Sequence, residues 1–133
     1  MMSCCYNTVM LPVNLYGIPN CSSVKKARDY LDSHLIDYIF FDFKKIDVSE
    51  LLLANWLTQL SVDKLINRAS LTWRGLDAAT KLGLHDVGQI NNSAFIKLMQ
   101  NQPTVIKRPI LEKDDKIISV GFDMQNYAQL FKS

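Results

Sequence analysis

Cys21 is the residue of this chain best placed for nucleophilic chemistry. It follows an apolar, strand-like run at 13–18 and a Pro19-Asn20 turn, and it precedes a helix-like run at 24–31. The first N–H groups of a helix lack partners within the helix, and the helix dipole is positive at that end. A thiol at a helix start therefore ionises more readily. Because thiolate is the reactive form of cysteine, we expect sulfur chemistry at Cys21.

A second chemical feature is Lys107-Arg108-Pro109, just before a predicted strand. Arginine presents a planar fork of N–H donors to oxyanions and carboxylates, and its charge also stabilises a nearby thiolate. Proline at a strand start is accommodated at a turn in either the trans or the cis form, and a cis bond there would fix the neighbouring backbone. An isolated Arg108 would more often make a surface ion pair, so its role depends on the fold.

Apolar periodicity predicts the elements that position these groups. Strands at 13–18 and 37–43 flank the helix after Cys21 and form a β-α-β opening. Asp47 and Glu50 resemble a capping arrangement for the next helix. The remaining elements are a series of helices, a hairpin and a closing helix, at about 48–60, 61–66, 72–82, 92–100, 109–120 and 123–131.

This order of elements predicts an α/β fold. A right-handed β-α-β crossover gives parallel strands, which the later hairpin extends into a mixed sheet. The expectation is a thioredoxin-like mixed sheet, made of β-α-β and β-β-α halves, with a helical subdomain inserted at about 46–103. In that plan the helix start at Cys21 lies beside the loop that carries Arg108. A single domain would span 13–133, after a flexible N-terminal tail at 1–12.

Composition narrows the function classes. The chain has 133 residues, 48% of them hydrophobic, and a formal net charge of +2 with acidic and basic residues interleaved, which predicts a globular domain that does not bind nucleic acid directly. No segment is typical of a signal peptide or a membrane span, so we expect a cytoplasmic protein. Cys4 and Cys5 adjoin each other near a terminus, so all three cysteines are expected as free thiols. His34 and His85 lack metal-ligand spacing, and neither a metal nor a tightly bound cofactor is expected.

The motifs resemble those of the arsenate reductase (ArsC)/Spx family, and in particular its small arsenate-reductase-like branch. The resemblance covers about 13–131 and rests on Leu15-Tyr16-Gly17-Ile18 before Cys21, on Asn67-Arg68, on 105–111 and on Val120-Gly121-Phe122. In the glutaredoxin-dependent arsenate reductases, one cysteine attacks the arsenic oxyanion, arginines hold its oxygens, and glutathione with glutaredoxin resolves the adduct. The resemblance implies that Cys21 and Arg108 are catalytic.

Further binding residues are expected around these two. The N–H groups of a helix start would face an anion, and a serine hydroxyl there would donate to the sulfur. Pro109 would shape the site. One arginine of the family pattern falls at Arg68, with Asn67 as the alternative at that position. The expected substrate-binding residues are Ser22, Ser23, Val24, Arg68 and Pro109.

Departures from the family pattern bear on the substrate. The reductases carry a further arginine after the hairpin, where this chain has Gly121, and Arg74 or Lys107 would have to fill that gap. They also commonly carry an arginine soon after the helix start, where this chain has Val24-Lys25. Fewer cations weaken the binding of a doubly charged oxyanion, so a mixed disulfide is the other candidate substrate. Spx regulators use a Cys-x-x-Cys pair, which Cys21 lacks.

The sequence therefore predicts a thiol oxidoreductase with Cys21 as its single redox cysteine, glutathione as co-substrate and glutaredoxin as a candidate partner. Cys4 and Cys5 would resolve an adduct only if the tail reaches Cys21. The alternative is an Spx-like regulator that binds the C-terminal domain of the RNA polymerase α subunit without catalysis. A third interpretation is a fold whose ancestral chemistry has been lost.

Overall fold

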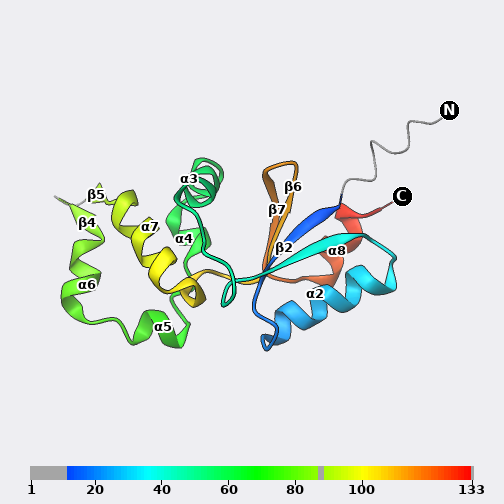
Figure 1. Ribbon diagram of the computed structural model, residues 1–133, viewed down its shortest axis with the longest axis horizontal. Coiled ribbons are helices and arrows are strands. Elements are labelled where there is room, and N and C mark those ends of the chain that lie inside the picture. The colour runs from blue at the N-terminus through cyan, green and yellow to red at the C-terminus, as the bar shows by residue number, and fades with distance from the viewer. Residues whose placement is uncertain (1–11, 87–88, 133) are drawn as a thin grey trace. The chain divides into compact units, whose positions relative to one another are not determined.

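The computed structural model describes residues 12–86 and 89–132. They form two compact units, labelled by element in Figure 1. The first unit joins the described parts of 1–42 and 108–133, and the second is Phe43–Lys107. The tail expected at 1–12 lies outside the described residues apart from Pro12, and so do Cys4 and Cys5.

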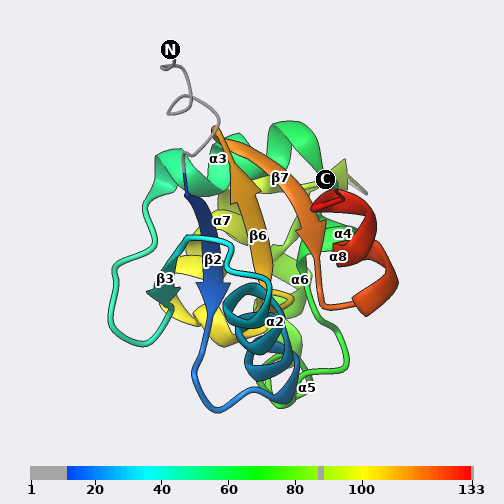
Figure 2. The same ribbon diagram turned by 90° about the vertical axis from the view of Figure 1, so that its right-hand side faces the viewer.

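The first unit contains a four-stranded mixed sheet. Its strands are β2 (Val13–Gly17), β3 (Tyr38–Asp42), β6 (Ile110–Lys113) and β7 (Lys116–Val120), in the order β3-β2-β6-β7. The first pair, β2 and β3, is parallel, whereas β6 runs antiparallel to both β2 and β7. The predicted thioredoxin-like sheet, with its β-α-β and β-β-α halves, is confirmed (Figure 2).

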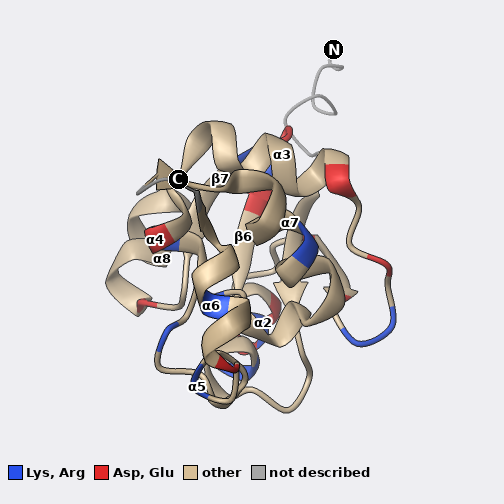
Figure 3. Ribbon diagram, turned by 90° about the vertical axis from the view of Figure 1, so that its left-hand side faces the viewer, with Lys and Arg blue, Asp and Glu red and all other residues tan. Residues whose placement is uncertain are grey.

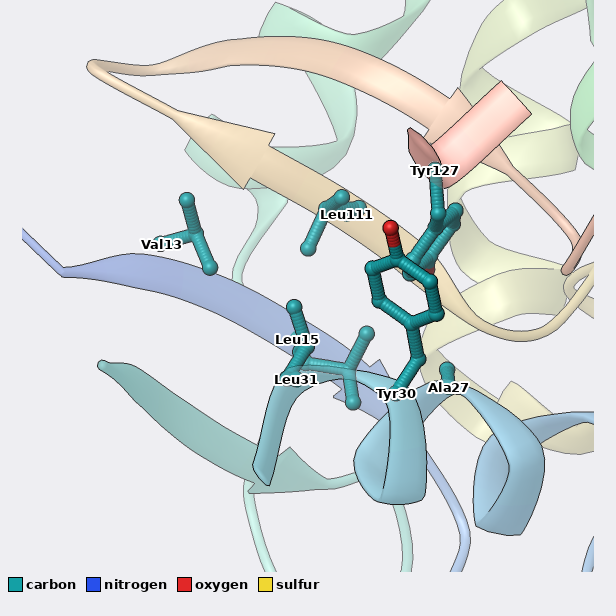
Figure 4. Packing of buried hydrophobic residues seen from close by; sticks show 7 residues of the cluster. All are labelled: Val13, Leu15, Ala27, Tyr30, Leu31, Leu111 and Tyr127. Atoms are coloured by element: carbon teal, nitrogen blue, oxygen red, sulfur yellow. The ribbon is translucent and has the colours of Figure 1, made fainter. Parts of the chain in front are cut away.

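Helices α2 (Ser22–Ser33) and α8 (Met124–Leu130) cover one face of this sheet (Figure 2). Side chains that alternate along the strands point toward them, as Leu15 and its cross-strand partner Leu111 do. The helices contribute Leu31 and Tyr127 to this contact, and none of these four side chains is accessible to solvent (Figure 4). Burying such side chains stabilises a fold by about 1.5–3 kcal/mol each, so this layer fixes α2 on the sheet.

The end of β2 approaches α2 so closely that Gly17 has no room for a side chain. A Cβ at Gly17 would lie 2.6 Å from Cγ2 of Val24. Val24 is fully buried in the first turn of α2, so it cannot swing out into solvent. The contact therefore sets the distance between the strand and the helix start that carries Cys21.

The hairpin between β6 and β7 turns through Asp114 and Asp115, which have φ angles of 51° and 64°. Two consecutive residues of positive φ are typical of a two-residue turn whose twist matches the strands. Aspartate tolerates this conformation better than most residues. The hairpin predicted at 109–120 is confirmed.

The second unit is mainly helical. Its main helices α3 and α7 pack against each other and contribute fully buried side chains, among them Trp56 and Phe95. The elements are α3 (Glu50–Gln59), α4 (Val62–Leu65), α5 (Leu71–Arg74), α6 (Ala78–Gly83), β4 (His85–Asp86), β5 (Gln89–Ile90), α7 (Asn92–Asn101) and the 3-10 helix η1 (Pro103–Val105).

The last residues of this unit are held by backbone pairing with the segment after α4. Ile66 and Ile106 form an antiparallel bridge, and the N–H of Lys107 donates to the carbonyl of Leu65 at 2.7 Å. The N–H of Asn67 donates to the carbonyl of Val105 at 2.8 Å. These bonds fix the backbone that leads directly into Arg108.

The single helix predicted at 72–82 is wrong. The chain forms two short helices there, because α5 ends at Gly75 and a new helix begins after Asp77. The carboxylate of Asp77 accepts a hydrogen bond from the N–H of Thr80 at 2.7 Å, which caps α6. Such a capping bond competes with continuation of the preceding helix.

The predicted cap of the preceding long helix is also wrong. Ser49, and not Asp47, stands directly before α3, and its hydroxyl accepts from the N–H of Leu52 at 3.0 Å. The short hairpin of β4 and β5 was not predicted, since strands of two residues carry no periodicity from which to recognise them.

Replacing Gly17 with alanine tests the close packing of β2 on α2. The added Cβ would clash with Val24, so we expect the free energy of unfolding to fall by about 1–3 kcal/mol, measured by urea denaturation. Gly83→Ala is the control, because nothing lies within 4 Å of a Cβ there. Equal stability of Gly17→Ala and the parent would contradict the packing constraint.

Candidate functional site

Cys21 occupies the N-cap position of α2. Its backbone is extended, with φ −94° and ψ 129°, and its side chain makes no capping hydrogen bond to α2. The N–H of Cys21 donates to the carbonyl of Ile18 at 3.3 Å, while its own carbonyl accepts from the N–H of Lys25 at 2.9 Å. The turn at Pro19-Asn20 is closed by the first of these bonds. The sulfur is consequently presented at the helix start, partly exposed to solvent.

The surroundings of the Cys21 sulfur lower its pKa below the ordinary value of 9.0. Burial opposes ionisation and is the largest single effect, but four contributions outweigh it together. The backbone N–H groups of Val24 and Ser23 favour the negative charge of the thiolate and lower the pKa, and the guanidinium of Arg108 lowers it further through its donor groups and its positive charge. More thiolate is therefore present near neutral pH than in an ordinary cysteine.

The loop before β6 brings Arg108 to the sulfur. The Arg108–Pro109 peptide bond is cis, and Pro109 is buried while Arg108 is half-buried. The carbonyl of Pro109 accepts from the N–H of Gly121 at 2.8 Å, which continues the β6–β7 pairing past the strand ends. Strand β6 also pairs with β2, the strand that leads to Cys21. The catalytic candidates Cys21 and Arg108 are thus held by neighbouring strands of one sheet.

Gly121 stands where the arsenate reductase pattern has a further arginine, and its backbone explains the glycine. Its φ is +80°, a conformation that side-chain-bearing residues rarely adopt. A Cβ built there would meet nothing within 4 Å, so the space beside Gly121 is open. Glycine therefore supplies no cation at this position.

The expected binding residues of the first unit fall into two groups. Ser23 and Val24 direct their N–H groups at the sulfur, as anticipated for a helix start. Ser22 is exposed, and it contributes none of the hydrogen bonds that lower the pKa of Cys21. Pro109 supplies the buried cis bond beside Arg108.

Arg68 belongs to the second unit, where its side chain has local partners. Its guanidinium lies 2.6 Å from the carboxylate of Asp63 and packs over the ring of Trp73, 5.1 Å from the centroid. The alternative at that family position, Asn67, accepts from the N–H of Ala69 through its side-chain oxygen. Both residues make local contacts within the second unit.

The two residues considered as replacements for the arginine at 121 also belong to the second unit. The ammonium of Lys107 lies 3.5 Å from the carbonyl of Asp63. Arg74 is exposed in the last turn of α5. Neither contributes to the lowered pKa of Cys21.

A buried carboxylate close to these elements was not singled out from the sequence. Glu112 of β6 is only 2% exposed and accepts hydrogen bonds from Asn14 at 3.0 Å and from the hydroxyl of Tyr16 at 3.3 Å. Burial and the neighbouring Glu112 raise the pKa of Tyr16, so its phenol stays protonated. The signal in the sequence is a glutamate inside an apolar strand, where a charged residue is seldom left without partners.

The described residues contain neither the pattern of a metal site nor that of a membrane-spanning helix. Among residues 12–86 and 89–132, no three His, Cys, Asp or Glu residues form a group that could hold a metal ion. No helix in the same ranges is long and apolar enough to span a bilayer. Positively and negatively charged segments are interspersed in Figure 3, in line with the net charge of +2.

The fold and the site together define a thioredoxin-like protein with a cysteine at a helix start beside a cis-proline loop. Residues 16–130 match the ArsC family, and the chain belongs to that family. A solved arsenate reductase (ArsC) related protein from Brucella melitensis is 39% identical to it with a TM-score of 0.67, covering 92% of this chain and 97% of that one.

Two further relatives match most of the chain. The solved YffB protein is 37% identical with a TM-score of 0.77, and the match covers 88% of this chain and 96% of that one. The global transcriptional regulator Spx of Listeria innocua is 30% identical over 115 residues, which is 84% of this chain and 80% of the regulator. The resemblance inferred from the motifs is confirmed, and the relatives include both a reductase-related protein and a regulator.

Replacing Arg108 with alanine tests its part in the ionisation of Cys21. Loss of the hydrogen bond and the charge should raise the pKa of the thiol, so we expect alkylation by iodoacetamide at pH 7 to slow by about three- to tenfold. The rate is followed from pH 5 to 10, with the modified cysteine identified by peptide mass spectrometry. The midpoint of the profile should move to higher pH.

Lys107→Ala is the matched control, since it removes a charge from the adjacent residue without touching the sulfur. Its alkylation profile should coincide with that of the parent chain. Identical profiles for Arg108→Ala and Lys107→Ala would show that the guanidinium does not stabilise the thiolate.

Proposed function

We propose that this protein is a thiol oxidoreductase that uses Cys21 as its single redox cysteine and glutathione as co-substrate in the cytoplasm. The observation that carries this proposal is the lowered pKa of Cys21 at the start of α2, where the helix-start N–H groups and Arg108 favour the thiolate. Membership of the ArsC family supports thiol-based chemistry at this cysteine. Glutaredoxin is a candidate partner for recycling the adduct.

In this proposal the Cys21 thiolate attacks the glutathione sulfur of a mixed disulfide between glutathione and a second thiol compound. A new S–S bond forms between Cys21 and glutathione, the original S–S bond breaks, and the second thiol leaves as thiolate. A further glutathione thiolate then attacks the adduct, releases glutathione disulfide and restores Cys21. Arg108 stabilises the thiolate at both ends of the cycle and binds an anionic group of the substrate.

A mixed disulfide suits this site better than a small oxyanion. Of the arginine positions expected from the reductase pattern, Arg108 lowers the pKa of the thiol, whereas position 121 is a glycine with positive φ and the helix start has Val24-Lys25 in place of an arginine. A doubly charged oxyanion held by fewer cations binds less well. A disulfide carries no double negative charge at the sulfur that is attacked, so it depends less on these cations. An oxyanion substrate therefore ranks second to a disulfide in this proposal.

Mild oxidation in the presence of glutathione tests the reductase proposal. We expect a glutathione adduct on Cys21, detected by intact-protein mass spectrometry and assigned by peptide mapping, and we expect added glutathione to remove it. The Cys4→Ser, Cys5→Ser double variant should form the same adduct. Absence of an adduct on Cys21 in that variant would overturn the proposal.

An Spx-like regulator is the second candidate, because the Spx relative is 30% identical over most of the chain. A regulator would bind the C-terminal domain of the RNA polymerase α subunit without needing the thiol. Purified α-subunit domain would then be retained by both the parent chain and Cys21→Ser, with a dissociation constant in the micromolar range or tighter, about 10⁻⁶ M. Under the reductase proposal no such retention is expected.

A further inference from the structure

A groove runs along the first unit between α2 and the segment that leads into α8. Its volume is about 850 Å³, within the range of about 300–1,000 Å³ that is typical of ligand sites. It begins at Ser23 and extends along α2 to His34. Cys21 does not line the groove, but it stands two residues before Ser23, at the same end of α2.

The length of the groove exceeds that of glutathione. From Ser23 to His34 the helix rises by about 16 Å, at about 1.5 Å per residue. An extended chain covers about 3.4 Å per residue, so the groove accommodates about five residues, whereas glutathione has three. A small oxyanion would occupy only the end next to Cys21.

Both walls of the groove carry apolar side chains. The ring of Tyr30 lies on the α2 side, and Phe122 and Met124 lie on the opposite side. Met124 is 64% exposed, which leaves a large apolar side chain open to solvent at the edge of the groove. Ala128 of α8 also lines the groove. Such surfaces bind an aromatic or aliphatic side chain of a ligand.

Charged groups in the groove are available for a ligand. Neither the ammonium of Lys26 nor the carboxylate of Asp29 makes an ion pair or side-chain hydrogen bond with another described residue. Lys26 stands one turn from Ser23, about 4.5 Å along the helix, and matches a position one or two residues from a bound cysteine. The far end is closed by His34, whose ring stacks on Tyr30 at 3.9 Å.

We infer that the groove binds an extended peptide segment, so that the substrate of Cys21 is a glutathionylated cysteine within a peptide or protein chain. The inference rests on the proposed function and names its substrate class. An acidic residue next to the cysteine pairs with Lys26, and an apolar side chain further along packs against Tyr30, Phe122 and Met124. In this reaction the peptide thiolate leaves and glutathione stays on Cys21. A second glutathione thiolate then attacks this adduct, which releases glutathione disulfide and restores Cys21.

Two disulfides separate peptide binding from glutathione binding. One is a five-residue peptide whose cysteine is joined to glutathione, with a glutamate next to the cysteine and a phenylalanine three residues from it, made in both chain orders. The other is glutathione disulfide, which lacks the peptide. We expect Cys21 to react with one of the peptides at least about tenfold faster than with glutathione disulfide, measured as the rate of adduct formation under single-turnover conditions.

Substitutions at the exposed edge of the groove test whether the faster reaction with the peptide depends on contacts there. Lys26→Glu should slow the reaction with the peptide by about three- to tenfold and leave the reaction with glutathione disulfide within about twofold. Lys25→Glu is the matched control: it makes the same charge change on the adjacent exposed residue, which does not line the groove, and it should slow both reactions equally. Ala128→Trp fills the groove from the other wall and should reproduce the effect of Lys26→Glu.

A binding experiment separates failure of the groove from failure of the proposed chemistry. A peptide with serine in place of cysteine is added to the full-length Cys21→Ser chain, and amide shifts are followed by NMR. Shifts at Lys26, Tyr30 and Phe122 without any adduct formation in the reactive assay would uphold the groove and overturn the reductase. If Lys26→Glu slowed both reactions equally, glutathione itself would occupy the groove, and the peptide inference would be overturned. The absence of shifts at these residues would overturn it as well.

Discussion

The ionisation of the Cys21 sulfur depends on a balance between burial, which opposes it, and nearby N–H donors with a positive charge, which favour it. Burial at the start of α2 raises the pKa of Cys21, and two backbone N–H groups together with Arg108 more than compensate. Every donor requires a particular placement of the backbone. The helix start is fixed by the close contact of Gly17 with Val24, and the loop of Arg108 is fixed by the pairing of β6 with β2 and by the bond from Gly121 to Pro109. The sheet thus serves chiefly to bring a helix end and a loop together.

The elements of the first unit could be predicted from the sequence because each has a strong local signal. Alternating and β-branched residues mark β2 and β3, and the apolar stripe of α2 follows the Pro19-Asn20 turn. Predictions failed where short-range hydrogen bonds decide between similar choices. Ser49 and Asp47 both accept capping bonds well, and only the structure shows which N–H lies within reach. The break between α5 and α6 depends on one aspartate in the same way.

The candidate site also has parts that could be predicted from the sequence and parts that could not. Cys21 and its helix-start donors follow from the order of strand, turn and helix, which is local in sequence. The approach of Arg108 is a contact between residues far apart in the chain, and it was predicted from the order of strands and helices, with the family resemblance in support. The cis state of the bond before Pro109 and the buried Glu112 with Asn14 and Tyr16 depend on neighbouring strands. No pattern within one segment determines them.

The positive φ of Gly121 has a consequence for how this branch of the family can change. An arginine substituted there would meet no steric obstacle from neighbouring atoms, yet it would force an L-residue into a left-handed backbone conformation at a cost of about 1 kcal/mol. Relaxing the backbone instead would disturb the bond to the carbonyl of Pro109, and with it the loop that carries Arg108. A cation at position 121 therefore costs either backbone strain or a shift of the neighbouring loop, so a single substitution there changes more than the charge near the sulfur.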